Sequence, residues 1–158
     1  NVGNWKNNFN QAIRLISNAG IITQFASIYL SRPYGYEQQH YYYNSALELK
    51  TNLSPYGLFN ELQMIEKKLQ KNKLFINGPR KVDLDIIFFN KLILTSNKLT
   101  IPHYAAHLRD FVLLPLIEMN PFYIHPLQKE TISAIYKKLK DKYVFKTKRR
   151  QKESLVIY

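Results

Sequence analysis

The stretch Gly78-Pro79-Arg80-Lys81-Val82-Asp83-Leu84-Asp85-Ile86-Ile87-Phe88-Phe89 joins an apolar run to two acidic residues. Side chains two residues apart in a strand point the same way, so a strand over 82–89 places Asp83 and Asp85 on one face. Two adjacent carboxylates repel each other, and burying either is costly without a cation. Magnesium prefers oxygen ligands and is often held by one or two carboxylates together with substrate phosphates. The stretch therefore predicts a magnesium site on a strand, and the alternative is a solvated edge strand with two unrelated acids.

Basic and histidine side chains lie on both sides of this acidic pair in the sequence. They are Lys71, Lys73, Arg80, Lys81, Lys98, His103, His107 and Arg109. Such donors suit a polyphosphate, so a metal-bound nucleotide triphosphate would match both the acids and the bases. The five glycines form neither a Gly-Lys-Ser/Thr phosphate loop nor a Gly-x-Gly-x-x-Gly turn, so side chains must hold any nucleotide. Taken alone, His103 is more typical of a core histidine, and the absence of cysteine disfavours a zinc site.

Helical and strand patterns alternate along the rest of the chain. Ser54 and Pro55 are typical of a helix start, and Asn90-Lys91 is typical of a hairpin turn. We expect helices over about 5–18, 54–71, 104–119 and 130–142, and strands over 21–30, 41–49, 82–89 and 92–94. This order predicts the α+β class with a mostly antiparallel sheet.

Composition narrows the class of protein further. The chain has 158 residues, 46% of them hydrophobic, which suffices for a packed core. The lack of cysteine excludes a disulfide scaffold and a cysteine nucleophile. No apolar run approaches the roughly 20 residues of a membrane span, so we expect a cytoplasmic protein without a membrane partner. The net charge is +12, of which residues 137–152 supply +8, as expected for a solvated basic linker or tail.

Several motifs together resemble the 6-hydroxymethyl-7,8-dihydropterin pyrophosphokinase family of the folate pathway. They are Gly78-Pro79-Arg80, Asp83-Leu84-Asp85, Leu99-Thr100-Ile101-Pro102-His103-Tyr104, Arg109-x-Phe111, Arg32-Pro33-Tyr34-Gly35, Tyr42-x-Asn44 and Gln63-x-x-Glu66. The resemblance covers about residues 1–125 and implies a ferredoxin-like sandwich with helices packed on the sheet. It also implies transfer of pyrophosphate from ATP to 6-hydroxymethyl-7,8-dihydropterin, with release of AMP and the use of two Mg²⁺ ions.

The resemblance also implies roles for individual residues. The catalytic group would be Lys71, Arg80, Asp83 and Asp85, with Asp83 and Asp85 as the metal ligands. ATP would contact Gln63, Glu66, Lys73, Ile86, Lys98, Leu99, Thr100, His103, Tyr104 and Arg109. The pterin would contact Ser31, Arg32, Tyr34, Tyr42, Asn44 and Phe111. Tyr42 and Phe111 would be stacking walls, although ordinary core packing is the commoner role of aromatic residues.

Some positions depart from the family pattern. Lys71 and Lys73 stand where the family usually has arginines, and a lysine offers a point charge in place of a bidentate fork. Asn77 replaces an aromatic residue, and Arg32 replaces a common proline. We expect these changes to affect closure of a catalytic loop more than the chemistry.

The same resemblance suggests how the chain is organised. Residues 1–136 would be the pyrophosphokinase domain, with its first strand encoded upstream of Asn1, because the family begins with a core strand. Residues 137–158 would be a basic linker or tail. Leu155 to Tyr158 resembles the approach to the first barrel strand of dihydropteroate synthase, so a fused or associated dihydropteroate synthase is one expectation for this side of the chain.

A ferredoxin-like RNA-binding module is the competing hypothesis. It would explain the charge of +12 together with the 12 Tyr and 9 Phe residues. However, the aromatic residues do not form the K/R-G-F/Y-G/A-F strand pattern, and Asp83 and Asp85 would repel a phosphate backbone. We therefore expect small-molecule partners and no nucleic acid.

Overall fold

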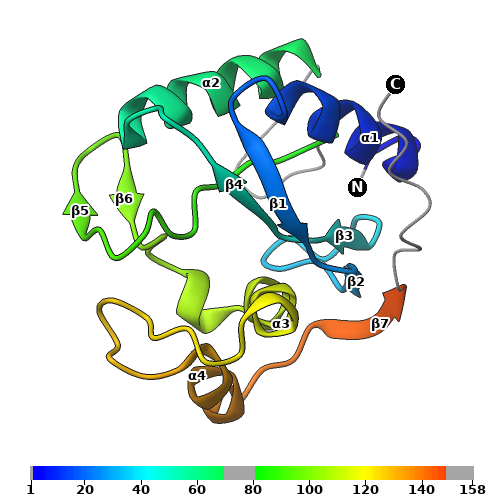
Figure 1. The fold of residues 1–158 in the computed structure, drawn as a ribbon. Helices are drawn as coiled ribbons and strands as arrows, with labels where there is room; N and C mark the ends of the chain where they lie inside the picture. The colour runs from blue at the N-terminus through cyan, green and yellow to red at the C-terminus, as the bar shows by residue number, and fades with distance from the viewer. Residues whose placement is uncertain (1, 70–80, 149–158) are drawn as a thin grey trace.

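The computed structural model describes residues 2–69 and 81–148 (Figure 1). Along the chain it contains α1 (Trp5–Ile16), β1 (Ile21–Phe25), β2 (Ile28–Ser31), β3 (Tyr42–Asn44), β4 (Leu47–Lys50), α2 (Pro55–Lys68), β5 (Leu94–Thr95), β6 (Thr100–Ile101), the 3₁₀ helix η1 (Ala106–Leu108), α3 (Asp110–Met119), α4 (Ile132–Lys138) and β7 (Val144–Lys148). All of the strand pairs are antiparallel. This mixture of helices and antiparallel strands confirms the α+β class.

A long bent hairpin forms the centre of the molecule. β1 pairs with β4 in its first half, and β2 pairs with β3 in its second half. At the bend, the Ala26 N–H donates to the Ala46 carbonyl at 2.9 Å, and the Ser45 hydroxyl donates to the Ala26 carbonyl at 3.0 Å. Each of the two strands expected over 21–30 and 41–49 is therefore present as two shorter strands.

The two helices predicted on the N-terminal side of the chain are confirmed, and the predicted start at Ser54 is the cap of α2. Asn4 Oδ1 accepts a hydrogen bond from the Asn7 N–H at 3.2 Å, and Ser54 Oγ accepts one from the Gly57 N–H at 3.1 Å. Their apolar stripes form one core with residues from the rest of the chain: Ala12, Ile16, Ala19, Leu58, Leu62, Ile65, Leu69, Ile86, Leu99 and Ile101. In Figure 1, the bent hairpin lies between this pair of helices and the pair formed by α3 and α4.

The expected helix over 104–119 begins later, at Asp110. Arg109 has extended backbone angles (φ −127°, ψ 112°), which break the helical path between η1 and α3. Leu113 packs with Ile132 and Ile135 of α4 in a second core. α4 also ends earlier than expected, at Lys138.

Residues 82–89 are extended but do not form the expected strand within the described part of the chain. Single hydrogen bonds link this segment to other elements: the His103 N–H donates to the Ile87 carbonyl at 3.0 Å, and the Leu84 N–H donates to Glu66 Oε1 at 2.7 Å. The predicted turn at Asn90-Lys91 is present, but β5 pairs with β6 and not with residues 82–89. A ladder needs a second edge in hydrogen-bonding range, and no described strand is paired with this segment.

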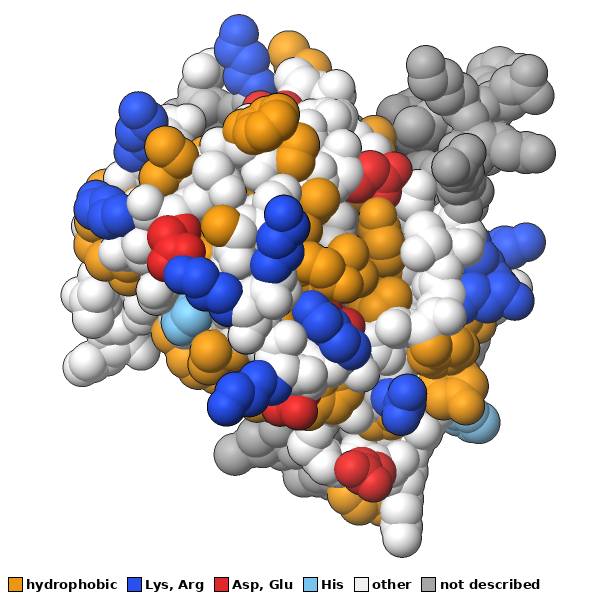
Figure 2. All heavy atoms as spheres, turned by 90° about the horizontal axis from the view of Figure 1, so that it is seen from below, with side chains coloured by type: hydrophobic (Ala, Val, Ile, Leu, Met, Phe, Trp, Pro, Cys, Tyr) orange, Lys and Arg blue, Asp and Glu red, His pale blue; other side chains and the backbone are white. Residues whose placement is uncertain are grey.

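The C-terminal side of the described chain joins the hairpin. β7 pairs with β2, giving the strand order β3-β2-β7. Residues 144–148, which lie in the range expected to be a linker, are thus part of a sheet. Within the described residues, no helix has the length and apolar character needed to cross a bilayer. Figure 2 shows Lys and Arg side chains spread among apolar and acidic ones on one face, and they do not form a single basic stripe there.

Glu118 of α3 ties this helix to β2. Its Oε2 accepts hydrogen bonds from the Ser27 N–H at 2.9 Å and the Tyr29 hydroxyl at 2.7 Å, and its Oε1 accepts one from the Ser27 hydroxyl at 2.8 Å. Burial raises the pKa of Tyr29 well above its usual value, and the hydrogen bond and the charge of Glu118 raise it further. Tyr29 therefore remains a protonated donor at all physiological pH values.

We expect Glu118→Ala to lower the free energy of unfolding by about 1–3 kcal/mol, because it leaves buried donors of Ser27 and Tyr29 without an acceptor. Glu118→Gln keeps one side-chain oxygen and should lose less. Urea unfolding of both variants would measure the difference, with Glu37→Ala in the exposed loop as the control. Equal stability of Glu118→Ala and the unchanged protein would contradict the proposed tie.

His125 is a buried histidine, 1% exposed, that accepts two backbone hydrogen bonds. Its Nδ1 accepts from the N–H groups of Leu127 and Gln128, each at 3.2 Å. Burial lowers the pKa of His125 below its ordinary value of 6.5, and the nearby His107 lowers it further. A proton on Nδ1 would break both hydrogen bonds, so the folded protein favours the neutral ring.

The folded state holds this proton less tightly than the unfolded state. The contribution of His125 to the free energy of unfolding should therefore be fully present above about pH 6.5 and should decrease as the pH drops below that value. Thermal melts between pH 7.5 and 5.5 would measure the slope. We expect His125→Asn to melt lower at pH 7.5 but to show a flatter pH dependence, since an amide oxygen can accept without titrating. His40→Asn, at an exposed site, should keep the original slope. A slope that is unchanged in His125→Asn would assign the pH dependence to other groups.

Candidate functional site

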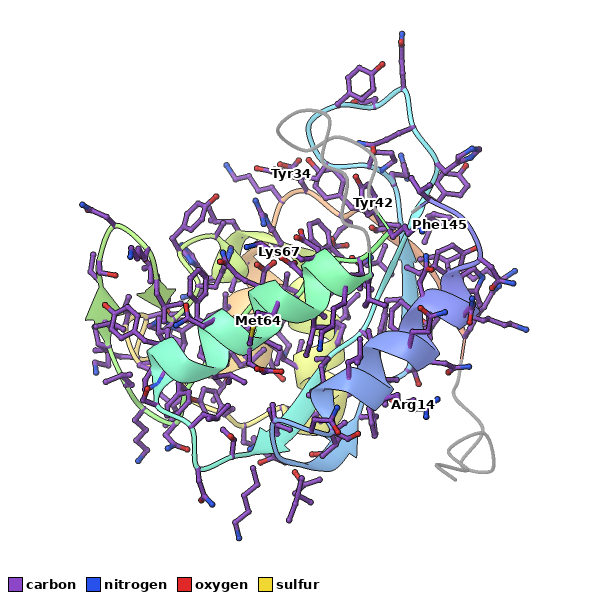
Figure 3. All side chains as sticks on the ribbon, turned by 90° about the horizontal axis from the view of Figure 1, so that it is seen from above. Arg14, Tyr34, Tyr42, Met64, Lys67 and Phe145 are labelled. Carbon is purple, nitrogen blue, oxygen red and sulfur yellow. The ribbon has the colours of Figure 1, made fainter. Side chains whose placement is uncertain are left out.

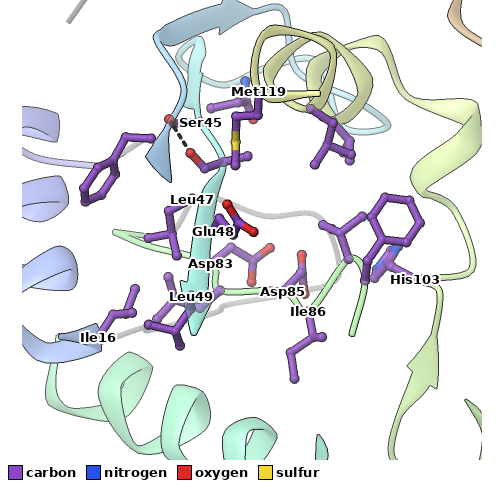
Figure 4. Close-up of a pocket in the computed structure, with 18 of the residues that line it drawn as sticks. Ile16, Ser45, Leu47, Glu48, Leu49, Asp83, Asp85, Ile86, His103 and Met119 are labelled. Carbon is purple, nitrogen blue, oxygen red and sulfur yellow. Dashed lines mark hydrogen bonds between the residues drawn. The ribbon is translucent and has the colours of Figure 1, made fainter. Parts of the chain in front are cut away.

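A cavity of about 810 Å³ lies between the bent hairpin and the extended residues 81–90. Side chains of α1, α2 and α3 also contribute to its wall, among them Ile16, Leu58 and Leu116. Figure 4 shows Leu47 and Leu49 on the side of β4 toward Ile16, and Glu48 of the same strand on the side toward Asp83. The cavity therefore has an apolar part and an acidic part.

The acidic pair lies on one side of its segment, as the alternation of side chains predicted. In Figure 4 the carboxylates of Asp83 and Asp85 point the same way, and Ile86 points in the opposite direction. Leu84 and Ile86 instead contact the core beneath α2. The segment thus has its apolar side buried and its acidic side toward the cavity, although it belongs to no ladder.

Glu66 fixes the backbone between the two aspartates. This α2 side chain is 8% exposed, and its Oε1 accepts a hydrogen bond from the Leu84 N–H at 2.7 Å. Glu66 was expected at the ATP end of the site, but it is not among the residues that line the cavity. Its contact with Leu84 places it under the acidic segment.

The donor set fits magnesium. Asp83 and Asp85 line the cavity together with Glu48, and magnesium commonly uses one or two protein carboxylates while water and phosphate oxygens complete its shell. Within residues 2–69 and 81–148, no group of three or more Asp, Glu, His or Cys side chains is suited to hold a metal ion. Water and the phosphate oxygens of a substrate are suited to the remaining positions.

Two nitrogen donors share the cavity with the acids. His103 and Arg109 both line it, and the pKa of His103 is lowered by partial burial and by the Arg109 charge, against the opposing influence of Asp85 and Asp83. His103 Nδ1 accepts from the Ala105 N–H at 3.3 Å, so the neutral ring carries its proton on Nε2 and can donate it to a ligand. Tyr104 stacks on His103 with ring centroids 4.8 Å apart but is itself 70% exposed.

Aromatic and amide groups form the other end of the cavity. Tyr34, Tyr42 and Phe111 line it, together with Ser31 and Arg32. Tyr34 and Tyr42 lie on the same side of the molecule in Figure 3. The Arg109 guanidinium is 4.9 Å from the Tyr34 ring centroid and 5.9 Å from that of Phe111, so one cation connects the acidic and aromatic ends.

Asn44 is held in place at this aromatic end. Its Nδ2 donates to the hydroxyl oxygen of Ser31 at 3.0 Å and to the carbonyl of Tyr29 at 3.2 Å. Tyr42 is positioned in a similar way, since its hydroxyl donates to Gln39 Oε1 at 2.7 Å. These bonds fix an amide and a ring edge before any ligand arrives.

The sequence-predicted residues thus separate into three groups. The cavity brings together Ser31, Arg32, Tyr34, Tyr42, Asn44, Asp83, Asp85, Ile86, His103, Arg109 and Phe111. It is not lined by Gln63, Glu66, Lys98, Leu99, Thr100 or Tyr104. Lys71, Lys73, Asn77 and Arg80 lie outside the described residues, so the roles expected of them stay predictions.

Sequence reasoning missed two residues beside the site, Asp110 and Tyr143. Asp110 was the unassigned position between Arg109 and Phe111, and Tyr143 fell in the expected linker. The two residues are 33 positions apart, and their contact is a hydrogen bond from the Tyr143 N–H to Asp110 Oδ2. No local sequence pattern carries that signal.

Comparisons with known proteins agree on one family. The family model described as 7,8-dihydro-6-hydroxymethylpterin-pyrophosphokinase matches residues 1–121. A Haemophilus influenzae protein named 2-amino-4-hydroxy-6-hydroxymethyldihydropteridine pyrophosphokinase is 36% identical over 136 residues, which cover 86% of this chain and 84% of that protein. A Bacillus subtilis protein of the same name is 37% identical, with coverage of 85% and 79%.

Larger relatives contain a similar region. The folic acid synthesis protein fol1 of Pneumocystis carinii is 36% identical over 142 residues, which cover 89% of this chain but 19% of that protein. A folate synthesis bifunctional protein of Arabidopsis thaliana is 40% identical over 121 residues, covering 75% of this chain and 25% of that protein. The chain therefore spans about a fifth to a quarter of the length of these larger relatives.

Proposed function

Because this chain belongs to the 7,8-dihydro-6-hydroxymethylpterin-pyrophosphokinase family, we propose that it transfers the pyrophosphoryl group of ATP to 6-hydroxymethyl-7,8-dihydropterin and releases AMP. In this reaction the pterin hydroxyl oxygen bonds to the β-phosphorus, the bond from that phosphorus to the α,β-bridging oxygen breaks, and AMP leaves with that oxygen. The observation that carries the proposal is one cavity lined by paired carboxylates, nitrogen donors and an aromatic end with an amide.

At the acidic end, Asp83 and Asp85 would hold magnesium. When bound, magnesium neutralises phosphate charge and aligns the reacting oxygens, which is most of what phosphoryl transfer requires. Two ions are part of the proposal, because a triphosphate carries several negative charges and two carboxylates on one side of a segment can be shared between cations. Glu66 would keep the two aspartates aligned through its hydrogen bond with the Leu84 N–H.

Arg109 and His103 would bind phosphate oxygens. The guanidinium is permanently charged, and the lowered pKa of His103 favours a neutral ring whose Nε2–H can donate. Neither residue has to lose a proton for this role. Lys71, Lys73 and Arg80 remain predicted phosphate contacts, and Gln63, Lys98, Leu99, Thr100 and Tyr104 remain predicted contacts of ATP.

At the aromatic end, the pterin would lie against Tyr42 and Phe111. The Nδ2 group of Asn44 already donates to Ser31 and Tyr29, so its Oδ1 would accept from an N–H on the pterin edge. A ring system with several donors suits a slot of this kind, because the flat faces meet aromatic rings and the polar edge meets a fixed amide. Arg32 and Tyr34 would contact the same substrate.

We extend the proposal to the organisation of the chain. A ferredoxin-like sandwich is supported by the helices packed on the bent antiparallel hairpin. The pyrophosphokinase domain would comprise residues 1–136 together with β7, which pairs with β2. A fused or associated folate enzyme such as dihydropteroate synthase is supported by the larger relative whose name is folate synthesis bifunctional protein. Both substrates are water-soluble, and we propose the cytoplasm as the site of reaction.

The function is tested by incubating the protein with ATP, Mg²⁺ and 6-hydroxymethyl-7,8-dihydropterin, and separating the nucleotides by chromatography. We expect AMP to appear only when all three are present, in a one-to-one ratio with the pterin diphosphate. ADP as the product, or AMP formed without the pterin, would contradict pyrophosphoryl transfer. Salt-dependent RNA binding that is unaffected by Asp83→Ala would instead favour the RNA-binding hypothesis.

The acidic pair should be needed for turnover and not for folding. We expect Asp85→Ala and Asp83→Ala to lower kcat by about 100-fold or more, because each removes a ligand for the cation that stabilises the transition state. Asp141→Ala, an exposed acid outside the cavity, is the matched control and should leave kcat unchanged. Removing one of two repelling charges should also leave the melting temperature without metal unchanged, and a large loss there would count against the metal site.

A further inference from the structure

β7 follows the residues that the family model matches, and it lies directly beside the proposed pterin end. It pairs with β2, in which Ser31 lines the cavity and has Val144 as its partner in the register. Tyr143 comes immediately before this strand. The Arg32 N–H donates to the Tyr143 carbonyl at 3.0 Å, which extends the link past the end of β2.

Asp110 holds the other side of the same backbone. It is the first residue of α3 and is 1% exposed. Its Oδ2 accepts hydrogen bonds from the N–H groups of Tyr143 and Val144, both at 2.8 Å. A buried carboxylate with two such donors is a strong and specific anchor, so α3 and β7 are fixed to each other at this point.

The ring of Tyr143 completes an aromatic cluster with Tyr34 and Phe111. Its centroid is 5.4 Å from that of Tyr34, at an interplanar angle of 66°, and 6.2 Å from that of Phe111, at 83°. Tyr34 and Phe111 are themselves 6.2 Å apart at 62°. Tyr34 and Phe111 line the cavity while Tyr143 does not, so Tyr143 contacts both rings without being part of the cavity wall.

We propose that Tyr143 and Asp110 are positioning residues for the pterin end of the site. Tyr143 limits the rotation of Tyr34 and Phe111 through edge-to-face contacts, and Asp110 acts through Tyr143 by holding its backbone. Neither residue contacts the substrate. The inference rests on the proposed function, because it assigns the affected substrate to the aromatic end of the cavity.

The test compares Tyr143→Ala with Tyr143→Phe, which keeps the ring, in the AMP-release assay. We expect Tyr143→Ala to raise the KM for the pterin about tenfold, while the KM for ATP and kcat change less than about twofold. Tyr143→Phe should restore the pterin KM. The control is Phe145→Ala, since Phe145 lies two residues further along, on β7, is 47% exposed and contacts Tyr41, and it should leave all three constants unchanged.

A second arm tests whether Asp110 acts through Tyr143. Asp110→Asn keeps an acceptor oxygen and should cause a smaller rise in the pterin KM than Asp110→Ala. In the Tyr143→Ala background, Asp110→Ala should raise the pterin KM by less than about a further twofold, because the ring that Asp110 helps to position is already absent. If Asp110→Ala does not fold, Asp110→Asn in the same background gives the same comparison.

The outcomes separate the two proposals. If the unchanged protein turns over and Tyr143→Ala alters neither KM, or raises both equally with a matching loss of melting temperature, the positioning role is wrong while the proposed function stands. If the unchanged protein releases no AMP under any substrate condition, the proposed function fails and the positioning role fails with it.

Discussion

The hydrogen bond from the Leu84 N–H to the buried Glu66 carboxylate is the contact on which the acidic end of the cavity depends. Leu84 stands between Asp83 and Asp85, and among described residues its segment belongs to no ladder. With the backbone fixed there and Ile86 packed in the core, the two neighbouring carboxylates have to face the cavity. Glu66, which does not line the cavity, thereby determines the direction of two acids that do.

Carboxylates that accept hydrogen bonds from backbone N–H groups also join other elements around the site. Glu118 accepts from the Ser27 N–H and joins α3 to β2, and Asp110 accepts from two N–H groups and joins α3 to β7. In a chain with 23 basic and 11 acidic residues, a surface ion pair would be the default partner of an acid. Each of these three acids accepts from backbone N–H groups, which cannot rotate away, and such charge-assisted hydrogen bonds are worth more than an exposed ion pair. Main-chain donors therefore help to fix the elements around the site.

The features that could be predicted from the sequence are those that depend on residues close together in the chain. Ser54 caps its helix within three positions, and the apolar residues of α1 and α2 repeat at helical spacing, so both helices were predicted. The motif around Asp83 and Asp85 likewise identified residues that lie in one cavity. Pairing over long distances was not predictable: β5 pairs with β6, and 82–89 pairs with no described strand, because pairing depends on which edges meet in space. The late start of α3 depends on the extended backbone of Arg109, which no neighbouring residue type requires.

β7 shows most directly how local charge can mislead. Lys146 and Lys148 made its sequence look like part of a solvated linker, yet it pairs with β2 more than 100 positions earlier in the chain. The Lys148 ammonium lies 5.2 Å from the Trp5 ring centroid and 5.6 Å from that of Tyr43, and these two rings stack at 4.5 Å. A cation over two stacked rings stabilises the junction of α1, β3 and β7. Part of the positive charge of the C-terminal segment therefore contributes to packing, and a net charge read from the sequence alone does not separate that use from binding of an anionic partner.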